Sequence, residues 1–227
     1  MMKKILCISD QIDPVIYSKN VKEKYGDVDF IISAGDLPIE YLDFVQNALN
    51  KPLFFVFGSH NLKALTHYHP EMAEKSNGDE INIFKKANEI KSNKGTYIGF
   101  KSCKYENIIL AGISGAKKRN DGKNQFTERQ MKRKLSRMIP ALLLNKIKYG
   151  RYLDILVTHS PPILGEEKEE NKQLRFECFT KFINFFKPKY IIHGQVHIYD
   201  SQQTRSTKYK NAEIINAYSR HILELNS

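Results

Sequence analysis

Short apolar runs, each followed by a polar cluster, recur along the whole chain. They are rich in Ile, Leu, Val and Phe and show no clean alternation with polar residues, which is typical of strands covered on both faces. The pattern therefore predicts a core of buried strands. The runs are Lys4–Ser9, Asp29–Ser33, Pro52–Phe57, Ile108–Ala111, Ile155–Thr158 and Tyr190–Ile192.

Segments with helical periodicity lie between the first three runs. Pro14–Tyr25 follows the first run and Pro38–Asn50 follows the second. An alternation of strands and helices is typical of a parallel α/β arrangement, which we expect at the start of the fold. The second segment places four apolar side chains on one face: Tyr41, Leu42, Val45 and Leu49.

The middle and the end of the chain are less regular. Asn61–Asn93 is polar and predicts a loop-rich excursion, whereas Thr96–Gly99 and Ile108–Gly112 predict a pair of strands. Phe176–Phe186 predicts a helix, and Thr204–Leu225 predicts a terminal pair of strands. No internal repeat or low-complexity segment interrupts this order, so a single domain suffices.

One helix has a well-marked start. Thr127 can cap it together with Gln130 three residues later, and Phe126 can pack on the first turn. Pro140 lies within the same periodic segment and is expected to kink or split the helix. Its buried face is predicted to carry Met131, Leu135, Met138 and Leu142, and its exposed face Lys132, Arg133 and Arg137.

Most of the positive charge belongs to this region. The formal charge of the chain is +11, and residues 117–151 contain twelve Lys or Arg against two acids. Such a basic patch attracts phosphate-bearing partners: a small substrate, nucleic acid or a membrane surface. A solvated helix face is the alternative. Only Phe126 and Tyr149 are aromatic there, so base-stacking positions are sparse.

Composition argues against a membrane protein and against a disulfide-bonded one. No run approaches the roughly 18 apolar residues of a membrane span, and the apolar stretch Ile5–Ile8 is too short for a signal peptide. Cys7, Cys103 and Cys178 are isolated in the sequence, which favours a reducing compartment. We therefore expect one cytoplasmic domain spanning residues 1–227.

Carboxylates and imidazoles stand where the predicted strands stop. The carboxyl ends of strands in open α/β sheets converge on the ligand crevice. Carboxylate and imidazole groups gathered there are ligands that manganese, iron or zinc prefer. The residues concerned are Asp10, Asp36, His60, His159 and His197.

In their order, these clusters resemble the DxH, GD, GNH(D/E), H and GHxH motifs of the calcineurin-like metallophosphoesterases. The resemblance covers nearly the whole chain and implies a four-layer αββα sandwich of two mixed sheets, with the metal site at the carboxyl ends of the strands. It implies that Asp10 and His197 hold a first metal, that Asp36 bridges to a second, and that His159 binds the second. His60 would assist the leaving group.

Several positions depart from the family pattern. Ile12 stands where DxH has its histidine, and Asp13 could replace that lost imidazole as a ligand. Ser59 replaces the asparagine of GNH, and Gln195 replaces the first histidine of GHxH, so both would be weak ligands. We expect one tightly bound metal, held by Asp10, Asp36 and His197, and a weak second site.

Two further residues are expected to support the ligands without binding metal. Asn61 replaces the acid that would orient His60, and His193 precedes the GHxH motif at the end of a strand. Asn61 has no carboxylate, and His193 lies one residue before the motif, so we expect neither to bind a metal.

The resemblance implies hydrolysis of a phosphomonoester or phosphodiester by a metal-activated water. The alternative is a non-catalytic module that binds phosphate or nucleic acid and has lost turnover, because three ligand positions are altered. A nuclease activity would unite the site with the basic patch. The substrate stays open at this stage.

Overall fold

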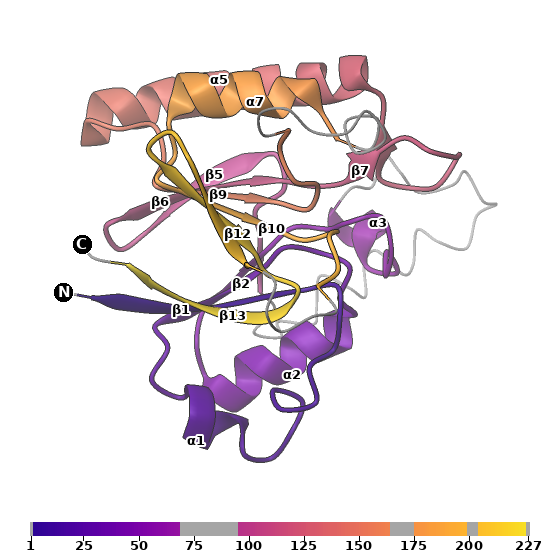
Figure 1. Cartoon of the computed structure of the whole chain (residues 1–227), viewed down its shortest axis with the longest axis vertical. Helices are drawn as coiled ribbons and strands as arrows, with labels where there is room; N and C mark the ends of the chain where they lie inside the picture. The colour runs from indigo at the N-terminus through magenta and orange to yellow at the C-terminus, as the bar shows by residue number, and fades with distance from the viewer. Residues whose placement is uncertain (1, 69–94, 164–174, 199–203, 226–227) are drawn as a thin grey trace.

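The computed structural model describes residues 2–68, 95–163, 175–198 and 204–225 (Figure 1). Its first sheet has the strand order β13-β1-β2-β3-β4. The inner strands pair in parallel, and β13 pairs antiparallel with β1. The strands are β1 (Lys3–Ser9), β2 (Phe30–Ser33), β3 (Leu53–Phe55), β4 (Thr96–Tyr97) and β13 (Ser219–Leu225).

The second sheet has the order β11-β12-β10-β9-β6-β5. Its four central strands are parallel, and an antiparallel strand closes each edge. The strands are β5 (Lys101–Tyr105), β6 (Ile108–Ile113), β9 (Ile155–Thr158), β10 (Tyr190–His193), β11 (Ser206–Tyr209) and β12 (Ala212–Asn216); β7 (Ala116–Lys117) and β8 (Gln125–Phe126) form a separate short pair.

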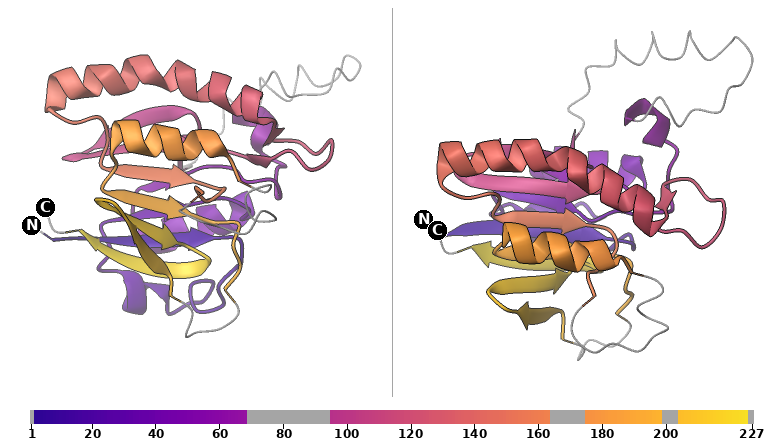
Figure 2. Two further views of the ribbon diagram at one scale, coloured as in Figure 1. Left: turned by 45° about the horizontal axis from the view of Figure 1, so that its top comes forward. Right: turned by 90° about the horizontal axis from the view of Figure 1, so that it is seen from above.

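Helices cover the outer face of each sheet (Figures 1 and 2). One apolar cluster packs the first sheet on α2, a second fills the space between the sheets, and a third packs the second sheet on α5 and α7. The four-layer sandwich with two mixed sheets is therefore confirmed. The helices are α1 (Val21–Tyr25), α2 (Ile39–Leu49), α3 (Leu65–Tyr68), α5 (Glu128–Tyr149) and α7 (Glu177–Phe186).

Alternate residues of the central strands supply these layers. Ile31 of β2 faces α2 and Ile32 faces the other sheet, while Leu156 and Val157 of β9 divide in the same way. Successive side chains of a strand point to opposite faces, so a strand covered on both sides must be apolar at every position. This explains the uninterrupted apolar runs of the sequence.

The structure confirms the main features of α5. Thr127 and Gln130 form a capping box, and the predicted apolar face is buried. The helix does not split at Pro140 but continues through it. Pro140 removes one backbone donor, and both it and Ser136, whose carbonyl loses that partner, are exposed. Water can therefore satisfy the freed carbonyl, which lowers the cost of the proline.

The prediction of a helix over Pro14–Tyr25 is half wrong, because only α1 is helical. The Asp13 carboxylate accepts from the Val15 N–H at 2.8 Å, and the Ser18 hydroxyl donates to the Val15 carbonyl at 2.7 Å. Such local bonds between side chain and backbone compete with helix formation. The preceding residues consequently form turns.

The strand predictions for the middle of the chain and the tail are met in part. Strands are present in both Thr96–Gly99 and Ile108–Gly112, but β4 joins the first sheet and β6 the second, with a single bridge from Gly99 to Gly112. The tail contains three strands, of which β13 returns to the first sheet. Of the expected excursion over 61–93, residues 69–93 lie outside the described part. No helix of the described residues is long and apolar enough to cross a membrane.

Candidate metal centre

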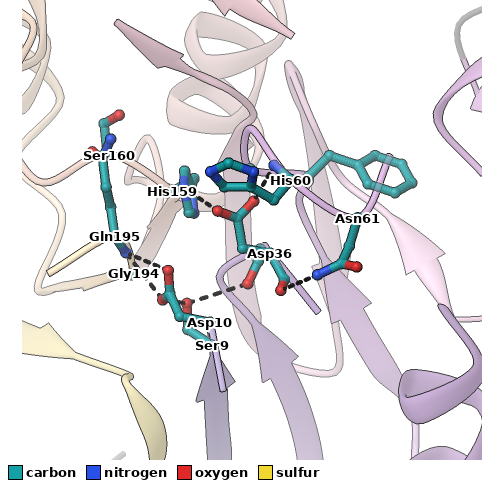
Figure 3. A network of polar contacts seen from close by, with 12 residues as sticks. Ser9, Asp10, Asp36, His60, Asn61, His159, Ser160, Gly194 and Gln195 are labelled. Atoms are coloured by element: carbon teal, nitrogen blue, oxygen red, sulfur yellow. Dashed lines mark hydrogen bonds and ion pairs between the residues drawn. The ribbon is translucent and has the colours of Figure 1, made fainter. Parts of the chain in front are cut away.

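Three of the predicted ligands meet at one end of the sandwich (Figure 3). Asp10 follows β1, Asp36 follows β2 and His159 follows β9, so two strands of one sheet and one strand of the other contribute. Ligand atoms of these three residues lie within 4.8 Å of one another. The predicted placement at the carboxyl ends of the strands therefore holds for this trio.

The loops that carry the site have unusual backbone conformations. Asp10, Asp36 and Gln195 adopt positive φ angles of 63°, 59° and 66°. A residue with a side chain pays roughly 1–3 kcal/mol for such a conformation, which persists where the surrounding structure enforces it. Asp10, Asp36 and Gln195 are three of the eleven such residues in the described part of the chain, and their conformations aim the site loops toward one another.

Close backbone approach keeps the trio together. A methyl group at Gly58 would overlap the Asp36 carboxylate and the His159 ring, and one at Gly194 would overlap the Asp10 carboxylate. Both positions therefore need glycine, since any side chain would displace a ligand.

The orientation of His159 shows that this group of donors fits a cation. Its Nδ1 lies 2.9 Å from the Ala34 carbonyl, which can only accept, so Nδ1 carries the proton. Its buried Nε2 makes no hydrogen bond, although it lies 3.3 Å from an Asp36 carboxylate oxygen. A lone pair at Nε2 would be repelled by this carboxylate, so the contact requires a positive charge, which either a second proton on the imidazole or a metal ion supplies. A metal ion would satisfy both groups, and the carbonyl behind the imidazole is a usual support of a histidine ligand.

Burial and mutual charge perturb the protonation of all three groups. Burial raises the pKa of the Asp10 carboxyl. Burial alone would raise the pKa of Asp36, but the adjacent His159 imidazole holds it below its usual value. Burial alone would lower the pKa of His159, but the Asp36 and Asp10 carboxylates hold it above its usual value. Two buried carboxylates are costly beside one imidazole, and a divalent cation would compensate them.

The remaining predicted histidines lie at the mouth of the crevice. Nε2 of His197 is 4.0 Å from Oδ1 of Asp10, and its side chain is 47 % exposed and stacks on Tyr218. His60 is exposed, and its backbone N–H donates to Asp36 at 2.7 Å. Its imidazole lies beside the Asp36 carboxylate in Figure 3. All five predicted residues thus lie close together at one site, with His197 and His60 on its exposed side.

Comparison with known proteins agrees with this site. The calcineurin-like phosphoesterase family profile matches residues 3–199. The chain belongs to the calcineurin-like phosphoesterase family. No curated protein has a matching sequence.

Solved structures share the fold of this phosphoesterase family member at low sequence identity. TT1561 of Thermus thermophilus has a TM-score of 0.59 at 12 % identity, with 96 % of this chain and 90 % of that chain covered. A second crystal structure has a TM-score of 0.61 at 12 % identity and covers 99 % and 95 % of the two chains. Phosphopantetheinyl hydrolase (PptH) from Mycobacterium tuberculosis has a TM-score of 0.49 at 12 % identity, covering 95 % and 89 %.

Two residues at positions that depart from the phosphoesterase motifs contact the site. Gln195 donates its backbone N–H to both Asp10 oxygens, at 3.1 and 3.0 Å. Asn61 donates its amide to the Asp36 carbonyl at 2.8 Å and so supports the Asp36 loop. The metal-binding roles of the Gln195 amide and of the half-buried Ser59 stay predictions.

Asp13 does not join the trio. Its carboxylate accepts from Val15, from the Ser219 hydroxyl at 2.6 Å and from the Arg220 guanidinium. Oδ2 thereby ties the first loop to β13, and Oδ1 is engaged by the loop's own backbone. We infer that Asp13 has a structural role and does not replace the imidazole that is lost at Ile12.

His193 supports the site from behind. It is buried at the end of β10, and its Nδ1 lies 2.9 Å from the Gly194 carbonyl. Burial lowers the pKa of His193 to about 4, so the ring is neutral at physiological pH. A neutral ring next to Gly194 packs the loop that carries Gln195, as expected for a supporting residue.

Sequence reasoning missed two residues that hold the site loops. The Ser9 hydroxyl donates to the Asp10 carboxylate, and the Asn124 amide donates to the Gly58 carbonyl at 2.6 Å. Asn124 is buried and lies far from Gly58 in the sequence. The residues around Asn124, such as Asp121 and Gly122, are typical of an ordinary turn. No local sequence signal therefore indicates the contact with Gly58.

The basic patch of α5 is exposed as predicted: Lys132, Arg133 and Arg137 all face solvent. Glu128 at the start of the helix pairs with Lys117 at 3.1 Å, so part of the local charge is neutralised. No described contact links the three patch residues to the trio.

Proposed function

We propose that this chain hydrolyses a phosphomonoester or phosphodiester with the help of a divalent cation held by Asp10, Asp36 and His159. The observation that carries the proposal is the buried Nε2 of His159, which faces the Asp36 carboxylate without a hydrogen bond. Membership of the phosphoesterase family supports the same reaction class. The three free cysteines support a reducing, cytoplasmic location.

A divalent cation, for which we propose manganese, iron or zinc, supplies Lewis-acid stabilisation of phosphoryl charge and acidification of a water molecule. Asp10 and Asp36 contribute negative charge that holds such a cation, and Ala34 keeps the His159 lone pair directed at it. The Gln195 N–H orients the Asp10 carboxylate. Because Gly58 and Gly194 leave no side chain in the crevice, a phosphoryl group has room to approach.

His60 is the residue that we assign to the leaving group. Hydrolysis forms a bond from a water oxygen to phosphorus and breaks the bond to the leaving oxygen, which must take up a proton. His60 lies at the mouth of the crevice, where a leaving group would exit, and can donate that proton. General acid catalysis of this kind contributes typically about 10²–10⁴-fold.

For the number of metals we propose one tightly held cation and one weak site. His159 joins both carboxylates in the structure, whereas the sequence had assigned His197 to the tight metal. His197 and Gln195 lie next to Asp10 on its exposed side. They are the donors that we assign to the second, more weakly bound metal. A neutral amide stabilises a cation less than an imidazole does.

The test is a metal analysis of protein purified without chelator, followed by turnover of a generic phosphodiester and a phosphomonoester with manganese. Asp36→Asn should lose both metal and turnover. Asp27→Asn, a change of the same type at the exposed ion pair with Lys4, should lose neither. Two fully occupied metals in the unaltered protein would contradict the single-site proposal.

One observation favours a non-catalytic phosphate-binding module as the second candidate. The position of the lost imidazole is occupied by Ile12, which is 42 % exposed and has no ligand atom. Metal bound at one equivalent without turnover of either ester would support this candidate and refute the enzyme.

The basic patch can be tested for nucleic acid separately. Reversing Lys132, Arg133 and Arg137 should leave the fold intact because all three are exposed. If the patch binds nucleic acid, retention of a single-stranded oligonucleotide should fall steeply with salt and disappear in the variant. Unchanged retention and turnover would show that the patch is a solvated face.

A further inference from the structure

The outer surface of the α5–α7 layer is unusually apolar. Six of the ten large apolar residues that are exposed in the described part of the chain belong to these two helices: Ile139, Leu143, Leu144, Ile147, Tyr149 and Phe185. Ile147 is 80 % exposed and Phe185 59 %. Contiguous exposed apolar surface that is rimmed by polar groups marks interaction sites in soluble proteins.

The surface includes a groove between the two helices, which lie side by side over the second sheet (Figure 2). The groove encloses about 330 Å³. Leu135, Phe182 and Phe186 line it, together with the exposed Ile139 and Phe185. Its shape matches the space that a third helix would fill, because helices pack by placing side chains into such grooves.

Positive charge flanks the groove. Lys132 of α5 and Lys181 of α7 line it, and α5 as a whole carries seven basic residues against the single acid Glu128. An apolar floor between cations is complementary to a helix with an apolar stripe and acidic flanks. A second copy that docked through the same face would instead bring Lys132 and Lys181 against like charges.

The groove shares no lining residue with the candidate metal centre. It is formed by the two helices that cover the second sheet, whereas His159 follows the carboxyl end of β9 within that sheet. An occupant of this face could bind without blocking the crevice.

We propose that the α5–α7 groove binds an acidic amphipathic helix of a partner protein. Leucine-type side chains of the partner enter the groove, and its carboxylates pair with Lys132 and Lys181. A flat membrane would touch the ridges but leave the groove empty. Nucleic acid would gain nothing from the exposed aliphatic residues Ile139 and Leu143.

The experiment uses the full chain and two fluorescent peptides of identical Leu and Glu composition. One peptide has Leu at i, i+3, i+4 and i+7, and the other has the Leu residues scattered. We expect saturable binding of the patterned peptide alone, about tenfold weaker for Phe185→Gln. Met2→Gln, which alters an equally exposed apolar residue (61 %) outside this layer, should leave binding unchanged. Lys132→Glu with Lys181→Glu should also weaken it.

The same variants also test whether another class of partner binds this surface. The proposal is overturned if neither peptide binds or if the scattered peptide binds equally well. It is also overturned if Phe185→Gln instead abolishes binding to phosphatidylserine vesicles, retention of a single-stranded oligonucleotide, or self-association in sedimentation. Because Phe185 is largely exposed, its replacement should keep the thermal midpoint, which serves as the folding control.

Discussion

Asp10 and Asp13 lie on one short loop but have different proposed roles. Replacing each by Asn tests which carboxylate binds metal and which stabilises the fold. The Asp13 carboxylate is almost fully buried and receives the Arg220 guanidinium and the Ser219 hydroxyl. Hydrogen bonds to a charged group contribute roughly 1.5–3 kcal/mol. Removing one partner of a fully buried ion pair costs about 3–5 kcal/mol, but Arg220 is 39 % exposed and water can take up part of its charge.

We therefore expect Asp13→Asn to lower the free energy of unfolding by about 2–3 kcal/mol. In a chain of this length, that corresponds to a fall of roughly 5–10 °C in the thermal midpoint. Metal stoichiometry should be unchanged, because Asp13 does not join the trio. Burial alone would raise the pKa of Asp13, but Ser219 and Arg220 hold it below the ordinary value.

The pH dependence of Asp13→Asn follows from that lowered pKa. The folded state favours the ionised carboxylate, so its contribution is fully present above the pKa of the unfolded chain, about 3.9. The contribution is lost as pH falls through the lower pKa of the folded state. The stability difference between wild type and Asp13→Asn should thus be largest near neutral pH and shrink below about pH 4.

Asp10→Asn should behave in the opposite way. Burial raises the pKa of Asp10, so its ionised form opposes folding in the metal-free protein, and this penalty is relieved as pH falls. With chelator present, the variant should be as stable as wild type or more so. Manganese at 100 times its dissociation constant should stabilise wild type by about 2.7 kcal/mol and the variant not at all.

The assay is thermal unfolding by circular dichroism, with chelator and with manganese, alongside metal analysis of both variants. The reasoning is refuted if Asp13→Asn abolishes metal stabilisation while Asp10→Asn retains it. In that case Asp13 would be a ligand, and its bonds to β13 would have to break on metal binding.

Three further changes test the site and the core. Gly58→Ala should abolish metal binding because its methyl group would overlap the Asp36 carboxylate. Gly150 lies in open space at a positive φ of 73°, so Gly150→Ala should lower the free energy of unfolding by only about 1–2 kcal/mol and leave the metal content unchanged. Gln195→His should raise manganese occupancy toward a second equivalent and increase phosphoester turnover; unchanged occupancy would show that this position faces no metal. Leu142→Ala, at a fully buried position of α5, should lower unfolding free energy by about 2–5 kcal/mol in denaturant titration with turnover retained, and a loss below 1 kcal/mol would contradict its core assignment.

The order of motifs at strand ends, and the family resemblance that it carries, were sufficient to predict the fold and to name Asp10, Asp36 and His159 as candidate ligands, although His159 was assigned to the second metal. Buried strands are apolar on both faces, so their ends are marked sharply by the first polar residue, and parallel strands bring those ends to one edge. The sequence also predicted the capping box at Thr127 and the buried face of α5, because both depend on residues within a few turns of one helix. These features are local, and local spacing encodes them.

Contacts between distant segments decided the rest. Asp13 looked like a spare ligand, but Ser219 and Arg220 on the last strand both donate to its Oδ2, while Oδ1 accepts from the Val15 backbone. The polar edge strand β5 was missed because only its neighbour β6 and the helix above it give it a place in the sheet. His159 replaced His197 as the third member of the trio because it directly follows the central strand β9 and is fully buried, whereas His197 lies four residues beyond β10 and is exposed. Periodicity reports which side of an element is buried, but only the packed structure determines which distant groups meet there.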